Sequence, residues 1–138
     1  MDQKLIFLPV LMQVLLTFFV YGGITRVKNR AMAQGQVDVA RRALFKDAWP
    51  EEVQKYTNNL TNQFEAPVLF YVLCFVLCAT ISVNVLALVL AWIFVASRYA
   101  HAYVHTGSNF VPVRKNIFMF GVAMLAGLMI CALLGVVR

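Results

Sequence analysis

Four long apolar runs constrain what this chain can fold into more than any other feature of its sequence. Each run approaches or reaches the ~20 residues that a helix needs to cross a bilayer. The chain of 138 residues is 62% hydrophobic, whereas a soluble domain is roughly half apolar. We therefore predict an all-α integral membrane protein, a four-transmembrane-helix bundle. It would be a single membrane domain over residues 1–138, with helices at about 5–24, 64–83, 85–104 and 117–137.

The net charge of +6 is divided unevenly between the two sides of the predicted bundle. Ten cations fall on the side of the two long loops, and only Lys4 and Arg138 fall on the other side. Membrane proteins keep their basic loops inside, so we expect both termini outside and the loop at about 27–56 in the cytoplasm. Because the cations flank membrane helices, nucleic acid is not an expected partner. The ten are Arg26, Lys28, Arg30, Arg41, Arg42, Lys46, Lys55, Arg98, Arg114 and Lys115.

The two ends of the first extramembrane loop carry further signals. The first apolar run is followed by cations rather than an Ala-x-Ala cleavage pattern, so we expect it to be retained as a helix. In the loop, Val37, Ala40, Leu44 and Ala48 recur at helical spacing among basic residues. That pattern predicts a basic amphipathic helix lying on the membrane surface. The Pro50-Glu51-Glu52 sequence indicates a helix start.

The stretch 98–114 holds both histidines of the protein between two arginines and two apolar runs. Polar and titratable groups are costly beside a membrane, and their density here favours a functional site. The alternative is a basic interfacial loop that anchors two helices. His101 and His105 lie at i, i+4, but no His-Glu-x-x-His pattern accompanies them. We therefore predict no metal site, and we interpret the three cysteines, Cys74, Cys78 and Cys131, as small buried hydrophobes.

Asn62 and Glu65 are three residues apart, where the second apolar run begins. One interpretation is a helix start with Asn62 as the N-cap and Glu65 completing a capping-box-like pair. The other is an amide and a carboxylate that project together at the edge of the bundle. Glu65 is the only acid inside an apolar span, so it needs a cationic partner, and Arg98 or Arg114 is the expected one.

These residues also carry a resemblance to a known family. A four-span chain with Asn62-x-x-Glu65 opening its second helix, and Arg98-x-x-His101 followed by Pro112-x-Arg114, resembles the MAPEG family. These are membrane-associated proteins of eicosanoid and glutathione metabolism, and the chain resembles the bacterial-type microsomal glutathione transferases among them. The chain differs from the family pattern at Asn58, where an arginine is usual, and at His105, where a tyrosine is frequent.

The resemblance implies a homotrimer in the bacterial inner membrane, with glutathione as co-substrate bound between subunits near the cytoplasmic face. It implies that Arg114 is catalytic and faces the thiol. The implied glutathione-binding residues are Arg26, Arg30, Asn62, Glu65, Arg98, His101, Tyr103 and His105.

Glutathione chemistry suits these residue types. Arginine binds carboxylates bidentately, and the reactive species of a thiol is the thiolate. The second substrate would be a lipophilic electrophile that enters from the bilayer, and the enzyme would act as a transferase or peroxidase. The alternative is a non-catalytic MAPEG-like scaffold that binds lipids or small molecules, because a fold does not determine a function.

Overall fold

The computed structural model describes residues 1–138 and is entirely helical, without strands. Its helices form four segments that are long and apolar enough to cross a membrane: Gln3–Ala33, Glu51–Ala79, Val85–Thr106 and Val111–Val136. The predicted four-helix membrane fold is confirmed. In chain order the elements are η1 (Gln3–Ile6), α1 (Phe7–Ala33), η2 (Lys46–Ala48), α2 (Glu51–Gln63), α3 (Ala66–Ala79), α4 (Val85–Thr106) and α5 (Val111–Val136).

The first two spans are longer than their apolar runs. α1 continues past the predicted end at residue 24 to Ala33, and the second span begins at Glu51 rather than at residue 64. α2 starts as the sequence indicates, with Pro50 at the N-cap and two acids in the first turn. The span breaks at Phe64 and Glu65, because Pro67 has no N–H to donate and its ring excludes the carbonyl of Gln63.

Two local predictions are wrong. Residues 34–45 form a series of turns rather than an amphipathic helix. The chain reverses at Gly35, which has a φ of 67°, and Arg41 then binds the carboxylate of Asp47 at 2.9 Å, which closes a compact loop. Asn62 is not a cap, because it lies inside α2, and Glu65 at the N-cap of α3 makes no capping hydrogen bond.

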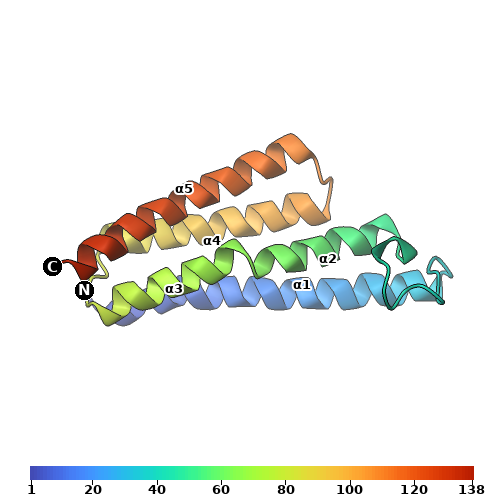
Figure 1. The fold of residues 1–138 in the computed structure, drawn as a ribbon, viewed down its shortest axis with the longest axis horizontal. Coiled ribbons are helices and arrows are strands. Elements are labelled where there is room, and N and C mark those ends of the chain that lie inside the picture. Colours follow the sequence, from blue (N-terminus) through green and yellow to red (C-terminus); the bar gives the residue numbers. More distant parts are fainter.

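The apolar core lies toward the end of the bundle that carries both termini (Figure 1). The rings of Phe70 and Phe94 stack there at 4.6 Å between α3 and α4. Cys74 is buried in the same cluster, and all three cysteines are free. α5 packs along α4, where Gly121 allows a close approach to Ser97 and Arg98.

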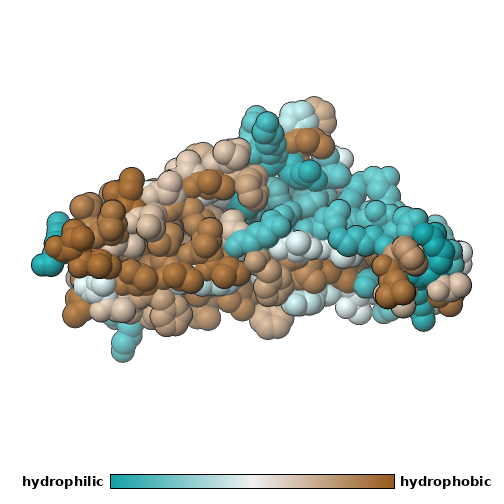
Figure 2. Space-filling model, in the orientation of Figure 1, coloured by the Kyte–Doolittle hydropathy of each residue, from teal (hydrophilic) through white to brown (hydrophobic).

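The opposite end of the bundle is polar. The connections between α1 and α2 and between α4 and α5 both lie at this end (Figure 1). Lys55 Nζ contacts the carbonyl oxygen of Gly107 at 3.4 Å and so joins α2 to the α4–α5 turn. Figure 2 shows hydrophilic residues over this end and hydrophobic residues over the end that holds the termini. The polar groups of the sequence therefore gather at one end of a membrane bundle.

Candidate functional site

The largest cavity at the polar end lies between α2, α4 and α5. Its volume of about 520 Å³ is within the roughly 300–1,000 Å³ typical of small-molecule sites. Most of its lining is polar, in contrast to the rest of the bundle. The lining residues are Lys46, Asn58, Thr61, Asn62, His101, His105, Val111, Arg114, Lys115 and Phe118.

The lining of this cavity contains three cations, Lys46, Arg114 and Lys115, and no acid. Arg114 is half-buried, and its Nη1 donates to Oδ1 of Asn109 at 2.6 Å. Asn109 itself has a φ of 54°, which turns the chain between α4 and α5. The guanidinium is thus held by the loop that precedes its own helix. A cavity with three cations and no acid is suited to an anionic ligand.

Arg98 adds a buried positive charge one helical turn below this cavity. The residue is only 2% exposed, and its Nη2 lies 3.5 Å and 3.4 Å from the carbonyl oxygens of Ile117 and Phe118. Its guanidinium lies over the ring of Phe118 at 4.9 Å, and its Nε has no partner. A buried charge without a counter-ion is costly, so this arrangement also favours an anion nearby.

Within the chain, the predicted pairing of Glu65 with Arg98 or Arg114 is wrong. Glu65 is exposed, and none of the four ion pairs of the chain includes it. The reason is the break before Pro67, which places Glu65 at the corner between α2 and α3, outside both helices. Its carboxylate therefore does not line the cavity.

A chain of side-chain amides runs from the interior of the bundle to the cavity. Gln13 on α1 donates to Gln63 on α2 at 2.9 Å, and Gln63 donates to Asn59 at 3.1 Å. Asn59 and Asn62 then both contact Nδ1 of His105 on α4, at 3.3 Å and 3.2 Å. The ring of His105 also lies edge-on to that of His101 at 5.4 Å.

The remaining predicted binding residues lie elsewhere. Arg26 donates to the hydroxyl of Tyr56 at 3.3 Å, and Arg30 forms an ion pair with Glu52, both on the α1–α2 surface. Tyr103 is 82% exposed and lines an apolar groove between α1 and α4 instead. The structure thus brings together Asn62, Arg98, His101, His105 and Arg114, but not Arg26, Arg30, Glu65 or Tyr103.

Sequence reasoning missed the amide residues Gln13, Asn59 and Gln63. Gln13 and Asn59 are fully buried. Neither has a charged residue next to it in the sequence that would mark it as part of a site. A signal was present, because Asn59 and Gln63 lie at i, i+4 and so share one face of a helix. The predicted start of the second span at residue 64 leaves both residues outside the bundle, whereas the span of the structure begins at Glu51.

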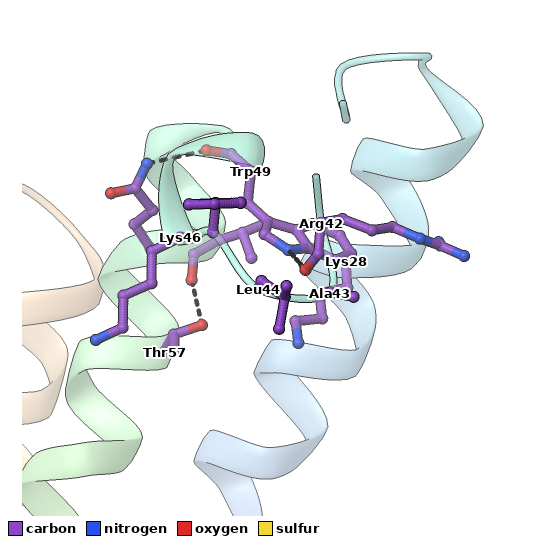
Figure 3. A pocket seen from close by; sticks show the side chains of 10 residues that line it. Lys28, Arg42, Ala43, Leu44, Lys46, Trp49 and Thr57 are labelled. Atoms are coloured by element: carbon purple, nitrogen blue, oxygen red, sulfur yellow. Dashed lines mark hydrogen bonds between the residues drawn. The ribbon is translucent and has the colours of Figure 1, made fainter. Parts of the chain in front are cut away.

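A second, smaller cavity of about 170 Å³ lies under the connection between α1 and α2 (Figure 3). Trp49 forms part of the cavity wall. Its indole N–H donates to the carbonyl oxygen of Arg42 at 3.2 Å, and Nζ of Lys28 lies 5.0 Å from the centroid of the ring. Arg42 directs its guanidinium away from the cavity, toward the sulfur of Met32. These contacts fasten the loop to α1 and α2, and they do not converge on a ligand.

Comparison with known proteins gives one match. The family model described as the MAPEG family matches residues 6–134, nearly the whole chain. Comparisons with curated proteins and with solved structures gave no match. The matched residues cover most or all of each membrane-spanning helix and every residue that lines the polar cavity.

Proposed function

This chain belongs to the MAPEG family, and on that premise we propose that it is a glutathione-dependent membrane transferase or peroxidase that acts on lipophilic electrophiles. The observation that carries the proposal is the polar cavity, which is lined by three cations and no acid. It lies at the polar end of the bundle, and the face drawn in Figure 2 is mostly hydrophobic over the other end. An anionic thiol and an apolar substrate can therefore approach the same place from different sides.

The residues of the cavity fit most of the groups of glutathione. Its two carboxylates suit Lys46 and Lys115, because charge-assisted hydrogen bonds to carboxylates are among the stronger ones. Its amine finds no carboxylate in the cavity, but the side-chain oxygens of Thr61 and Asn58 can accept hydrogen bonds from it. The fit is good for the anionic groups and weaker for the cationic one.

Arg114 is proposed to stabilise the thiolate. A free thiol has a pKa of about 8.5, so most of it is protonated at neutral pH, and each unit of lowering requires about 1.4 kcal/mol. A guanidinium held at the sulfur can supply an interaction of that size where water is scarce. The thiol proton passes to solvent, the sulfur forms a bond to the electrophilic carbon, and the leaving group takes the bonding electron pair. With a hydroperoxide, the sulfur instead bonds to the terminal oxygen, the O–O bond breaks, and the alkoxide leaves with the electron pair and is protonated. A second glutathione thiolate then attacks the sulfenic sulfur, which gives the disulfide and hydroxide.

We further propose that the active assembly is a homotrimer with both long loops in the cytoplasm. Identical subunits that share interfacial sites form closed cyclic assemblies. Arg26, Arg30, Glu65 and Tyr103 are exposed and lie outside the cavity of their own chain. A neighbouring copy would allow these residues to take part in a site formed between two subunits.

The alternative function is a non-catalytic scaffold that binds a lipid or small molecule. The observation that favours it is Asn58, which lines the cavity where an arginine is usual in the family. Incubation of the purified protein with glutathione and an electrophilic aryl halide separates the two. We expect thioether formation, followed by the absorbance of the product, above the rate in detergent alone. A rate equal to that of the detergent control would contradict the enzymatic proposal and favour the scaffold.

A further inference from the structure

His105 contacts two side-chain amides at one atom of its ring. Nδ1 of its ring lies 3.3 Å from Nδ2 of Asn59 and 3.2 Å from Nδ2 of Asn62. An amide nitrogen carries two N–H groups and no lone pair that can accept, so it can only donate. Nδ1 must then be an acceptor without a proton. A proton there would face two donors.

The orientation of the Asn59 amide is set by residues deeper in the bundle. Gln63 Nε2 donates to Oδ1 of Asn59, which uses the oxygen of that amide and leaves its nitrogen for His105. Gln13 Nε2 in turn donates to Oε1 of Gln63. Gln13, Asn59 and Gln63 are all buried, so no water competes for these groups, and turning one amide alone would place like groups face to face.

Only a reversal of the whole chain of amides would be self-consistent. In the observed direction, the one orphaned atom of the chain is the carbonyl oxygen Oε1 of Gln13. The reversed direction would instead leave the NH₂ group of Gln13 without a partner in the apolar interior. Orphaned buried N–H groups are rarer than under-satisfied carbonyl oxygens. The observed direction is therefore the more stable one, and it places the single ring proton of a neutral His105 on Nε2.

Nε2 of His105 is free to act on a ligand. It has no hydrogen-bond partner in the chain. The only fully enclosed side-chain polar atoms without a partner are Gln13 Oε1 and Arg98 Nε, so Nε2 of His105 is not sealed inside the protein. His105 lines the polar cavity together with Arg114. The ring is therefore held at one edge by two amides and presents its other nitrogen to the same space as the guanidinium.

We propose that the buried amide chain holds His105 in the Nε2–H tautomer, and that this N–H is a second donor, beside Arg114, to the thiolate sulfur of glutathione. Gln13, Gln63, Asn59 and Asn62 are positioning residues, because they act only through the ring. This inference rests on the proposed function for the identity of the anion. The tautomer itself follows from the contacts of the chain alone.

The tautomer is tested by nitrogen-15 NMR of protein labelled at histidine and purified without a polyhistidine tag. The chain has only two histidines, so a His101→Asn variant assigns both sets of signals. We expect Nδ1 of His105 to give the signal of an unprotonated nitrogen and Nε2 that of a protonated one. A proton on Nδ1, in either the other tautomer or the imidazolium, would overturn the inference.

The role of the amides is tested in the same spectrum. The double variant Asn59→Leu with Asn62→Leu removes both donors, and we expect the His105 signals to move toward the average of two exchanging tautomers. Asn58→Leu is the matched control, because Asn58 lies on α2 and lines the same cavity but does not contact the ring. It should leave the His105 signals in place. Unchanged signals in the double variant would contradict the positioning role.

The role toward sulfur is tested by kinetics. We expect His105→Phe to lower kcat with an aryl halide about tenfold or more, the loss of one hydrogen bond to a charged group, with little change in KM for glutathione. His105→Gln, which keeps an N–H donor, should retain most of the rate. If wild-type protein binds no glutathione, the proposed function and the thiolate role fail together. If it does bind and His105→Phe turns over normally, the role of His105 alone is contradicted.

Discussion

The side-chain nitrogen of Asn62 lies 3.2 Å from Nδ1 of His105, although the two residues are 43 positions apart in the sequence. The contact joins the last turn of α2 to the last turn of α4 and forms one wall of the polar cavity. The opposite wall, at the start of α5, is held by the bond of Arg114 to Asn109 at 2.6 Å. Polar contacts thus shape the cavity, whereas apolar packing holds the other end of the bundle.

Substitution of Gly121 tests how tightly α5 packs against the buried side chain of Arg98. A Cβ built at Gly121 would lie 2.7 Å from both Nη2 of Arg98 and Oγ of Ser97. Both side chains are buried and cannot easily move aside. We expect Gly121→Ala to lower the free energy of unfolding by about 1–3 kcal/mol, as overpacking usually does. Thermal unfolding in detergent, followed by helical circular dichroism, measures the change.

The matched control for this substitution is Gly22→Ala. Gly22 lies inside α1, and a Cβ built there meets nothing within 4 Å. Alanine in a helix interior is more stable than glycine by roughly 0.5–1 kcal/mol, so this variant should unfold at the wild-type temperature or slightly above it. Equal effects of the two substitutions would show that α4 and α5 are not packed through Gly121.

We expect native mass spectrometry from detergent to detect a trimer, and Glu65→Gln to weaken it. Glu65 is exposed at the break of a membrane-spanning segment, where an unpaired carboxylate is costly. Since its own chain provides no cation, a neighbouring copy is the remaining source of one in the assembly. The variant should keep its helical content while its trimers dissociate at lower detergent concentration or lower collision energy.

Glu51→Gln is the control for this experiment, because Glu51 is also exposed but pairs with Lys55 of its own chain at 3.1 Å. It should leave the assembly unchanged. Wild-type spectra that contain only monomer or dimer would contradict the trimer. Identical dissociation of the Glu65→Gln and wild-type trimers would contradict the contact across subunits.

The orientation of the bundle is tested by cysteine labelling in cells. Gln36 and Asn109 lie in the two connections at the polar end, and Ser82 lies in the short turn between α3 and α4 at the other end. In a background without the three natural cysteines, Ser82→Cys should react with a membrane-impermeant reagent added outside. Gln36→Cys and Asn109→Cys should react only after the membrane is opened. Labelling of both loop positions from outside would reverse the assignment.

The membrane spans could be predicted from the sequence because a helix in lipid must be apolar over its whole crossing length. Pro112 likewise lies in the first turn of α5, as expected for a proline near a helix start. The start of α2 could be predicted from Pro50 and the two acids after it, but its buried face could not, because only the structure shows that Asn59 and Gln63 face the interior. Hydropathy alone cannot distinguish a buried amide from a solvated one.

The candidate site could be predicted in part. The polar stretch after the third apolar run contains His101, His105 and Arg114, and the structure places all three in the lining of one cavity. The partner of Arg98 could not be predicted. The expected pairing with Glu65 used only the opposite charges of the two residues, and the sequence does not show which way either side chain points. The break before Pro67 turns Glu65 outward, and the guanidinium of Arg98 instead meets the carbonyl of Phe118 and its ring.

The central claim is that Arg114 stabilises a thiolate, and the alternative is that it only anchors α5 beside Lys115. Both residues line the cavity, but Arg114 is half-buried and bound to Asn109, whereas Lys115 is exposed. A stabiliser acts only if its charge lies at the sulfur. An anchor could be replaced as long as its neighbour remains.

The most direct measurement is the ultraviolet absorbance of bound thiolate when glutathione is added to wild-type protein, to Arg114→Gln and to Lys115→Gln. We expect the wild type and Lys115→Gln to develop this absorbance and to release protons. Arg114→Gln should keep its fold and much of its affinity for glutathione, but lose the thiolate signal and most of the turnover. Full thiolate absorbance and activity in Arg114→Gln would contradict the claim and favour the lipid-binding scaffold.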